Sequence, residues 1–276
     1  MNLLRPHQWI KNLLILFPPF FGGLLLYHDT IYLVVPAVLV FSAAASSSYI
    51  INDIQDASVD KNHSKKKNRP IACGEISKVQ AMSISIALFS ISIISSFYIS
   101  GVLWMYILAY LLISLSYTFF FKNVVILDIF FISAGFMIRV LAGGAIFNIE
   151  VSHWLFLTVF LVSLFLASGK RLAELLEMGT KAAAHRKSLS NYNPSFIEGV
   201  LWFAASAALV TYSLYTIEEK SALFYTVPLT AFGLLRYIYI VKTGVGDPTD
   251  ILLSDGQIMT TGIVWAIAIG IIKYGT

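Results

Sequence analysis

The chain has 276 residues, of which 58% are hydrophobic and 12% are charged. Soluble domains carry about 25% charged residues, so the composition excludes an ordinary soluble protein. The single cysteine, Cys73, excludes an internal disulfide. The net charge of +4 comes from basic residues in loops between apolar segments. Those loops lack the interleaved aromatic residues of a single-strand-binding surface, which argues against nucleic acid as a partner.

Apolar segments of spanning or near-spanning length recur along the whole chain. They predict an all-α, polytopic membrane protein with one domain over residues 1–276. No small-residue cleavage site directly follows the first segment and another long apolar segment does, so we expect the first helix to be retained. The nine predicted helices are 13–27, 31–51, 79–99, 102–120, 125–147, 153–168, 197–217, 222–241 and 258–274.

The positions of Lys and Arg predict the orientation. With nine helices, most basic residues fall on one side of the membrane, and only Lys220 and Lys273 fall on the other. Cytoplasmic loops carry the excess of Lys and Arg. The sequence therefore predicts a plasma-membrane protein with a cytoplasmic N-terminus and cytoplasmic polar loops.

The N-terminal segment RPHQWIKN enters the first predicted helix. Trp9 is interpreted as a membrane-interface anchor. Lys11 and Asn12 face either lipid headgroups or a functional site, and the sequence leaves both readings open.

The first polar segment runs from Asn52 to Lys78 and begins with a cluster of acids. On a helix, Asn52, Asp56 and Asp60 lie at i, i+4 and i+8, with Asp53 at the flank of the same face. Adjacent carboxylates repel one another unless a cation lies between them, and Mg²⁺ is commonly held by carboxylates together with substrate phosphates. The pattern predicts a metal-dependent enzyme that binds a diphosphate at the membrane surface, with the three aspartates as catalytic metal ligands beside Asn52.

Basic residues follow this cluster. Arg69 is suited to phosphate oxygens because its guanidinium has fork geometry. For the lysines at 65–67 we favour a solvated loop that helps to set the orientation.

The next polar loop, Tyr117 to Asp128, surrounds Lys122. Asp128 and Arg139 lie eleven residues apart and share one stripe of the fifth predicted helix. Arg139 has two interpretations to which we give equal weight. It forms a structural ion pair within the bundle, or it binds the phosphate or ribose of a substrate. Gly143 and Gly144 are expected to allow close helix packing.

The third loop, 169–194, begins with Lys170, Arg171 and Glu174, which are candidate substrate contacts. It is expected to contain an amphipathic helix, and His185 is expected to be exposed to solvent. The segment 246–250 is interpreted as a turn and a helix cap.

On these residues the chain resembles the UbiA superfamily of intramembrane prenyltransferases. The family's first motif, NDxxDxxxD, is matched by Asn52, Asp53, Asp56 and Asp60, and the resemblance covers all nine predicted helices. It implies a nine-helix bundle with a central cavity open to the cytoplasm and the membrane. A second acidic motif, DxxxD, is absent at the fifth helix, because Ile132 lies four residues after Asp128.

A finer resemblance is to the decaprenyl-phosphate phosphoribosyltransferase branch. Four segments carry it: RPHQWIKNLLILFPPFFGG, FKNVVILDIFFISAGFMIRVLAGG, SGKRLAEL and GDPTDILLSDG. It implies Mg²⁺ as cofactor, 5-phosphoribosyl diphosphate (PRPP) as donor, a long polyprenyl phosphate as acceptor and a role in arabinose-donor synthesis for the cell envelope. For such a reaction, the residues that we predict as substrate contacts are Lys11, Asn12, Arg69, Tyr117, Lys122, Asp128, Arg139, Lys170 and Arg171.

Two other functions stay open. An aromatic prenyltransferase would use the same acidic cluster to ionise a prenyl diphosphate. A transporter would bind a coupling cation near the bilayer midplane, whereas these acids lie at a helix end before a basic loop. The oligomeric state, including a homo-oligomer, is not predicted.

Overall fold

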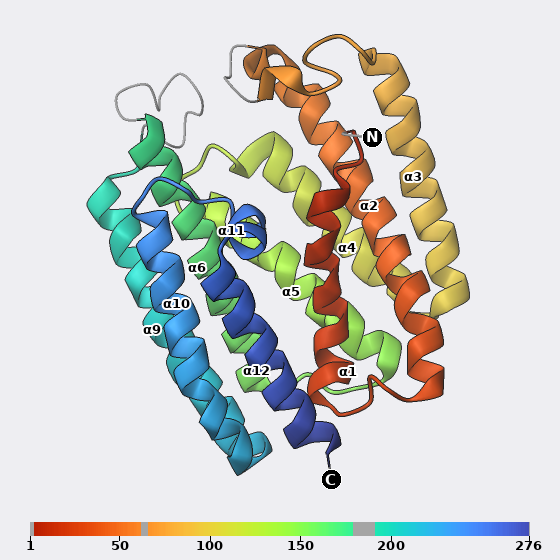
Figure 1. Cartoon of the computed structure of the whole chain (residues 1–276). Coiled ribbons are helices and arrows are strands. Elements are labelled where there is room, and N and C mark those ends of the chain that lie inside the picture. Colours follow the sequence, from red (N-terminus) through yellow and green to blue (C-terminus); the bar gives the residue numbers. More distant parts are fainter. Residues whose placement is uncertain (1–2, 62–65, 179–190, 276) are drawn as a thin grey trace. The chain divides into compact units, whose positions relative to one another are not determined.

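The computed structural model describes residues 3–61, 66–178 and 191–275, and within these ranges it contains helices and no strands (Figure 1). The all-α prediction is confirmed. Eight helices among the described residues are long and apolar enough to cross a membrane, which makes the chain an integral membrane protein. The predicted count of nine is not confirmed. The eight are His28–Asp60, Lys78–Ile99, Leu103–Phe121, Leu127–Phe147, His153–Glu177, Pro194–Glu219, Ser221–Val241 and Gly256–Tyr274.

The helices form two compact units. The first unit contains Met1–Pro19, Leu24–Lys122 and Ile138–Glu150, and the second contains Phe20–Gly23, Asn123–Met137 and Val151–Thr276. The helix α5 (Leu127–Phe147) begins in the second unit and ends in the first. One catalytic domain over the whole chain stays a prediction.

In the first unit, α2 packs along α3, and Figure 1 shows the two helices side by side. Two serines join them reciprocally: the Ser47 hydroxyl donates to the Ser85 carbonyl at 2.9 Å, and the Ser85 hydroxyl donates to the Ser47 carbonyl at 3.0 Å. Small hydroxyl residues allow such close approach between membrane helices. The elements of this unit are η1 (Pro6–Leu16), α2 (His28–Asp60), η2 (Lys66–Asn68), α3 (Lys78–Ile99), α4 (Leu103–Ser116) and the π-helical turn η3 (Tyr117–Phe121).

The N-terminal segment η1 is a 3₁₀ helix that runs antiparallel to α2. The Trp9 indole donates to Ser46 at 3.0 Å, and the Asn12 amide donates to Ser42 at 2.9 Å. A 3₁₀ helix rises about 2.0 Å per residue, so this segment extends farther than an α-helix of equal length would. The predicted α-helix over 13–27 is wrong, because the chain is 3₁₀-helical up to Leu16 and α-helical only over Phe17–Phe21. After η1 the chain forms only the short α1 (Phe17–Phe21), because two prolines and Gly23, at φ 73°, bring it into a turn.

Gly143 of α5 lies against η1, as the prediction of close helix packing required. A Cβ atom at this position would lie 2.1 Å from the Ile15 carbonyl oxygen. Backbone atoms cannot give way as a flexible side chain can. We expect Gly143→Ala to lower the free energy of unfolding by about 1–3 kcal/mol, measured in detergent by thermal unfolding.

Gly199 of α9 provides the matched control, because nothing lies within 4 Å of the Cβ atom added there. Gly199→Ala should leave stability unchanged or raise it by about 0.4–1 kcal/mol. Equal unfolding midpoints for the two variants would contradict the close contact at Gly143.

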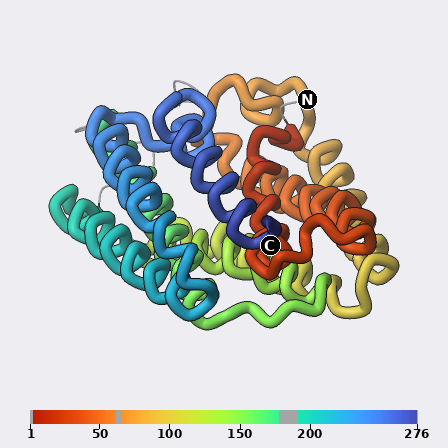
Figure 2. Tube along the Cα trace, turned by 60° about the horizontal axis from the view of Figure 1, so that its bottom comes forward, coloured from red at the N-terminus to blue at the C-terminus, as the bar shows by residue number. Residues whose placement is uncertain are grey.

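In the second unit, α10 lies between α9 and α12, as Figure 2 shows. Buried apolar residues join these helices to α6, with Phe165, Ile197 and Leu201 almost fully buried. Besides Leu127–Met137 of α5, this unit contains α6 (His153–Met178), α9 (Pro194–Glu219), η5 (Ser221–Thr226), α10 (Val227–Val241), α11 (Pro248–Ser254) and α12 (Gly256–Tyr274).

Two helices are longer than the sequence predicted. The predicted ends at residues 51 and 168 are wrong, because α2 continues to Asp60 and α6 continues to Met178. Neither continuation contains a proline, and both continue in helix-compatible residues after the apolar run ends. The predicted cap at 246–250 is confirmed, since the Asp247 side chain accepts from the Thr249 amide at 3.1 Å at the start of α11.

Candidate active site

The acidic cluster, defined as Asn52, Asp53, Asp56 and Asp60, occupies the last turns of α2. The predicted helical spacing is confirmed. Asp53 and Asp60 are buried, at 2% and 4% exposure, whereas the Asp56 side chain is 29% exposed. Carboxylates at a helix C-terminus are destabilised by the helix dipole, so the cluster needs cations nearby.

Three cations meet these carboxylates. Arg5 forms an ion pair with Asp53, and Lys122 forms one with Asp56. The Arg69 Nη1 donates to Asp53 Oδ1 at 2.9 Å and to Asp60 Oδ2 at 2.6 Å. The structure thus brings the predicted Arg69 and Lys122 to the acidic cluster.

Arg5 contacts the acidic cluster but was not predicted from the sequence as a site residue. It lies far from the cluster along the chain, and the antiparallel packing of η1 on α2 returns it to Asp53. The signal that could have found it is an arginine beside Pro6 at the start of an apolar segment, on the same predicted side of the membrane as the acids.

A π-helical turn places Lys122. The Lys122 amide donates to the Tyr117 carbonyl at 2.8 Å, across five residues. Thr118 on this turn donates to the Asn52 side chain at 3.5 Å and was also missed from the sequence. Single π turns are frequent at functional sites, because they redirect the side chains that follow. Tyr117 is half-buried on the same turn.

The donor chemistry of the cluster fits Mg²⁺. The residues with described positions contain no group of three or more His, Cys, Asp or Glu side chains gathered as a metal cage. Mg²⁺ does not require one, because it is usually held by one or two carboxylates with substrate phosphates and water. One nitrogen of Arg69 contacts both Asp53 and Asp60, so these two carboxylates can share a single positive centre.

A second polar group of the first unit lies deeper along α2. The Arg139 Nε donates to the Asn12 side chain at 2.7 Å, and its guanidinium lies 4.5 Å from the Tyr110 ring centroid. Asn12 in turn contacts Ser42, which is eleven residues, or about 16 Å of helix rise, from Asp53. The structure therefore brings Asn12 and Arg139 together but not to the acidic cluster. Lys11 is half-buried on η1.

In the second unit, Asp128 and Arg171 form a buried ion pair. The Arg171 Nε donates to Asp128 Oδ2 at 2.8 Å, and the two side chains are 2% and 0% exposed. Glu174 accepts from Arg171 at 2.7 Å. Asp128 and Arg139, which share a stripe of α5, thus have different contacts.

Tyr192 completes this ion pair. Its hydroxyl donates to Asp128 at 2.6 Å and accepts from the Ile126 amide at 2.7 Å. Burial, the hydrogen bond and the nearby carboxylate charge all raise the pKa of Tyr192 above its usual value, so the hydroxyl stays protonated as a donor. The sequence did not predict Tyr192 as a site residue.

Lys170, the residue before Arg171, pairs with Asp247 at 2.6 Å. Gly246 allows this approach, since a Cβ there would lie 2.2 Å from the Ala173 Cβ. The loop after α10 is therefore packed closely on α6. The amphipathic helix expected after α6, with His185, lies outside the described residues.

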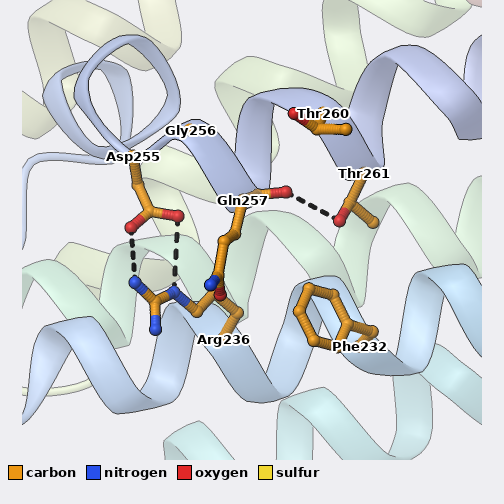
Figure 3. Close-up of a pocket in the computed structure, with 7 residues that line it drawn as sticks. All are labelled: Phe232, Arg236, Asp255, Gly256, Gln257, Thr260 and Thr261. Carbon is orange, nitrogen blue, oxygen red and sulfur yellow. Dashed lines mark hydrogen bonds and ion pairs between the residues drawn. The ribbon is translucent and has the colours of Figure 1, made fainter.

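An open pocket of about 630 Å³ lies in the second unit between α10 and the start of α12 (Figure 3). The Arg236 guanidinium binds both carboxylate oxygens of Asp255, at 2.7 and 3.3 Å. None of the predicted site residues lines this pocket, whose lining consists of Phe232, Arg236, Asp255, Gly256, Gln257, Thr260 and Thr261.

Comparison with known proteins decides the family. Residues 15–253 match the model of the UbiA prenyltransferase family. The chain belongs to that family. It is therefore a transferase, and the matched residues include the acidic cluster on α2.

Several relatives match almost the whole chain. The decaprenyl-phosphate phosphoribosyltransferase of Corynebacterium glutamicum is 35% identical, over 99% of this chain and 86% of its own length. The protein of the same name from Mycolicibacterium smegmatis is also 35% identical, over 99% and 92%.

Solved structures of a UbiA homologue from Archaeoglobus fulgidus share the fold. The form bound to DMAPP and Mg²⁺ gives a TM-score of 0.77 at 20% identity, over 99% of this chain and 98% of that one. The form bound to GPP and Mg²⁺ gives 0.75 at the same identity and coverage.

Proposed function

We propose that this protein transfers 5-phosphoribose from PRPP to a long-chain polyprenyl phosphate and releases pyrophosphate. The observation that carries the proposal is the match to decaprenyl-phosphate phosphoribosyltransferases over 99% of the chain. The acidic cluster with its three cations supplies the groups that a diphosphate substrate requires.

Donor binding is assigned to the acidic cluster. Asn52, Asp53, Asp56 and Asp60 would hold Mg²⁺, as the Mg²⁺-bound structures of the fold neighbours support. When bound, the metal supplies neutralising charge to the departing pyrophosphate. Arg69 and Lys122 already form ion pairs with these carboxylates. Both side chains are therefore close enough to contact the oxygens of a diphosphate bound at the cluster.

In the reaction, a phosphate oxygen of the lipid forms a bond to ribose C1 while the bond from C1 to the diphosphate oxygen breaks. The bonding pair leaves with pyrophosphate. The lipid phosphate is already an anion at neutral pH, so the reaction needs no strong general base. Lys11, Asn12 and Arg139 stay sequence predictions as contacts of the lipid phosphate, because Asn12 and Arg139 lie well away from the acidic cluster along α2. Tyr117, Asp128, Lys170 and Arg171 stay sequence predictions as substrate contacts.

The proposed setting is the plasma membrane, with the acidic cluster at the cytoplasmic end of α2. We assign the protein to arabinose-donor synthesis for the cell envelope and treat the chain as one catalytic domain. The strong asymmetry of Lys and Arg between the two predicted sides supports the orientation.

Prenyl transfer from a prenyl diphosphate is the second candidate. The fold neighbour bound to DMAPP or GPP with Mg²⁺ favours it. That donor would use the same acidic cluster, so the residues described above cannot distinguish the two reactions.

A donor comparison distinguishes them. Purified protein with Mg²⁺ is given polyprenyl phosphate and radiolabelled PRPP, alone and with increasing unlabelled geranyl diphosphate. We expect a labelled lipid product from PRPP and only weak inhibition by the prenyl diphosphate. Transfer of a labelled prenyl group to an aromatic acceptor, with no product from PRPP, would favour the second candidate instead.

A further inference from the structure

Arg5 is one of the three cations that form ion pairs with the carboxylates of the acidic cluster. Its guanidinium pairs with Asp53 Oδ1, the same oxygen that accepts from Arg69 at 2.9 Å. One buried carboxylate oxygen thus receives two guanidinium groups. The Arg5 side chain is 18% exposed and its guanidinium also lies 5.5 Å from the Tyr49 ring centroid, so it is partly enclosed there.

The charges around the acidic cluster balance. Asp53, Asp56 and Asp60 are paired by Arg5, Arg69 and Lys122. A divalent cation that enters without an anion would leave this partly buried group with two uncompensated positive charges, and burying uncompensated charge is costly. The same cation entering with a diphosphate brings its own counter-charge. The arrangement therefore favours the metal–diphosphate complex over the bare metal.

We propose that Arg5 is a further donor-binding residue that moves from Asp53 to the diphosphate when the metal–diphosphate complex binds. While paired with Asp53, it excludes bare metal by holding a ligand oxygen. With Asp53 acting as a metal ligand, the Arg5 guanidinium would lose its carboxylate partner and would pair with oxygens of the diphosphate that enters with the metal. This inference rests on the proposed function only in requiring that the acidic cluster bind a metal diphosphate.

The backbone around Arg5 is held to α2 independently of the Arg5 side chain. Arg5 itself has a positive φ of 50°, a conformation that few non-glycine residues adopt. Residues on either side of Arg5 are held to α2 by separate hydrogen bonds, since the Leu4 carbonyl accepts from Ser46 at 2.9 Å and the Trp9 indole donates to the same serine at 3.0 Å. The Arg5 side chain can therefore exchange partners while η1 stays on α2.

Two binding measurements on the full chain in detergent test the proposal, with Mn²⁺ as the probe for the metal. Electron paramagnetic resonance measures the affinity for bare Mn²⁺, and filter binding measures the affinity for ³²P-pyrophosphate in saturating Mn²⁺. In the wild type, each ligand should raise the affinity for the other: Mn²⁺ should tighten pyrophosphate binding, and pyrophosphate should tighten Mn²⁺ binding, by at least about fivefold. This factor lies within the usual range of coupling between two ligands.

The variant Arg5→Gln should change the two affinities in opposite directions. Bare Mn²⁺ should bind about tenfold more tightly because a competing cation is gone, and Mn²⁺-pyrophosphate should bind about tenfold more weakly because a phosphate partner is gone. Arg5→Lys keeps the charge and should stay close to the wild type in bare Mn²⁺ affinity.

A fall in both affinities, or no change in either, would overturn the role of Arg5 and leave the proposed function standing if the wild type binds Mn²⁺-pyrophosphate. If the wild type itself fails to bind Mn²⁺ with pyrophosphate, the metal-diphosphate site is wrong and both proposals fall. Loss of both affinities accompanied by a lower unfolding midpoint would show that Arg5 acts only in folding, which also overturns the proposal.

Discussion

Replacing Asp56 by Asn should abolish most of the transferase activity. Asp56 is the most exposed carboxylate of the acidic cluster and pairs with Lys122, so it is open to both metal and donor. An amide of the same shape removes one charge from the proposed metal site and replaces the carboxylate that pairs with Lys122. Removing one group that stabilises developing charge costs about 10²–10³ in kcat, and we expect a loss of at least that size. The measurement is labelled lipid product formed per unit time in Mg²⁺.

Asp29→Asn is the matched control. Asp29 lies on the same helix, in its first turn, far along α2 from the acidic cluster, and its side chain is fully exposed. The same change of acid to amide there should leave activity within about twofold, since exposed substitutions away from a site have small effects. Equal losses in the two variants would mean that α2 is sensitive to any charge change and that Asp56 has no special role.

Replacing Arg171 by Leu should strongly destabilise the second unit. The change leaves Asp128, which is fully buried, without its guanidinium partner and leaves Tyr192 as its main donor. Breaking a buried ion pair by removing one partner costs about 3–5 kcal/mol. Thermal or denaturant unfolding in detergent would measure it.

The double variant Asp128→Leu with Arg171→Leu should recover much of that loss, because no buried charge is left unpaired. As a comparison, the exposed pair of Lys242 and Glu198 in the same unit can be broken by Lys242→Ala. Exposed pairs contribute about 0–1 kcal/mol, so this variant should unfold near the wild-type midpoint. If Arg171→Leu behaved like Lys242→Ala, the buried pair would not support the fold of the second unit.

The part of the fold predicted best is the part fixed by local pattern. The apolar runs predicted where the membrane helices lie. The spacing of Asn52, Asp56 and Asp60 predicted that these residues share one helix face. Helix ends were predicted less well, because the first polar residues after an apolar run indicate the membrane surface but do not end the helix. In α2 and α6 the helix continues past the apolar run.

The pairing of charges could not be predicted from local pattern. Arg5 reaches Asp53 through the antiparallel packing of η1, and Arg171 reaches Asp128 from another helix. Both contacts depend on tertiary packing between segments far apart in the chain. The π turn before Lys122 was also missed, because a run of aromatic residues reads equally well as the end of an α-helix.

The most direct test of the account is the transfer of label from PRPP to polyprenyl phosphate by the purified protein, with Mg²⁺ and with EDTA in its place. We expect a labelled lipid in Mg²⁺, no product in EDTA, and recovery when Mg²⁺ is returned in excess. Equal product formation in Mg²⁺ and in EDTA would contradict a metal-dependent phosphoribosyl transfer at the acidic cluster of α2.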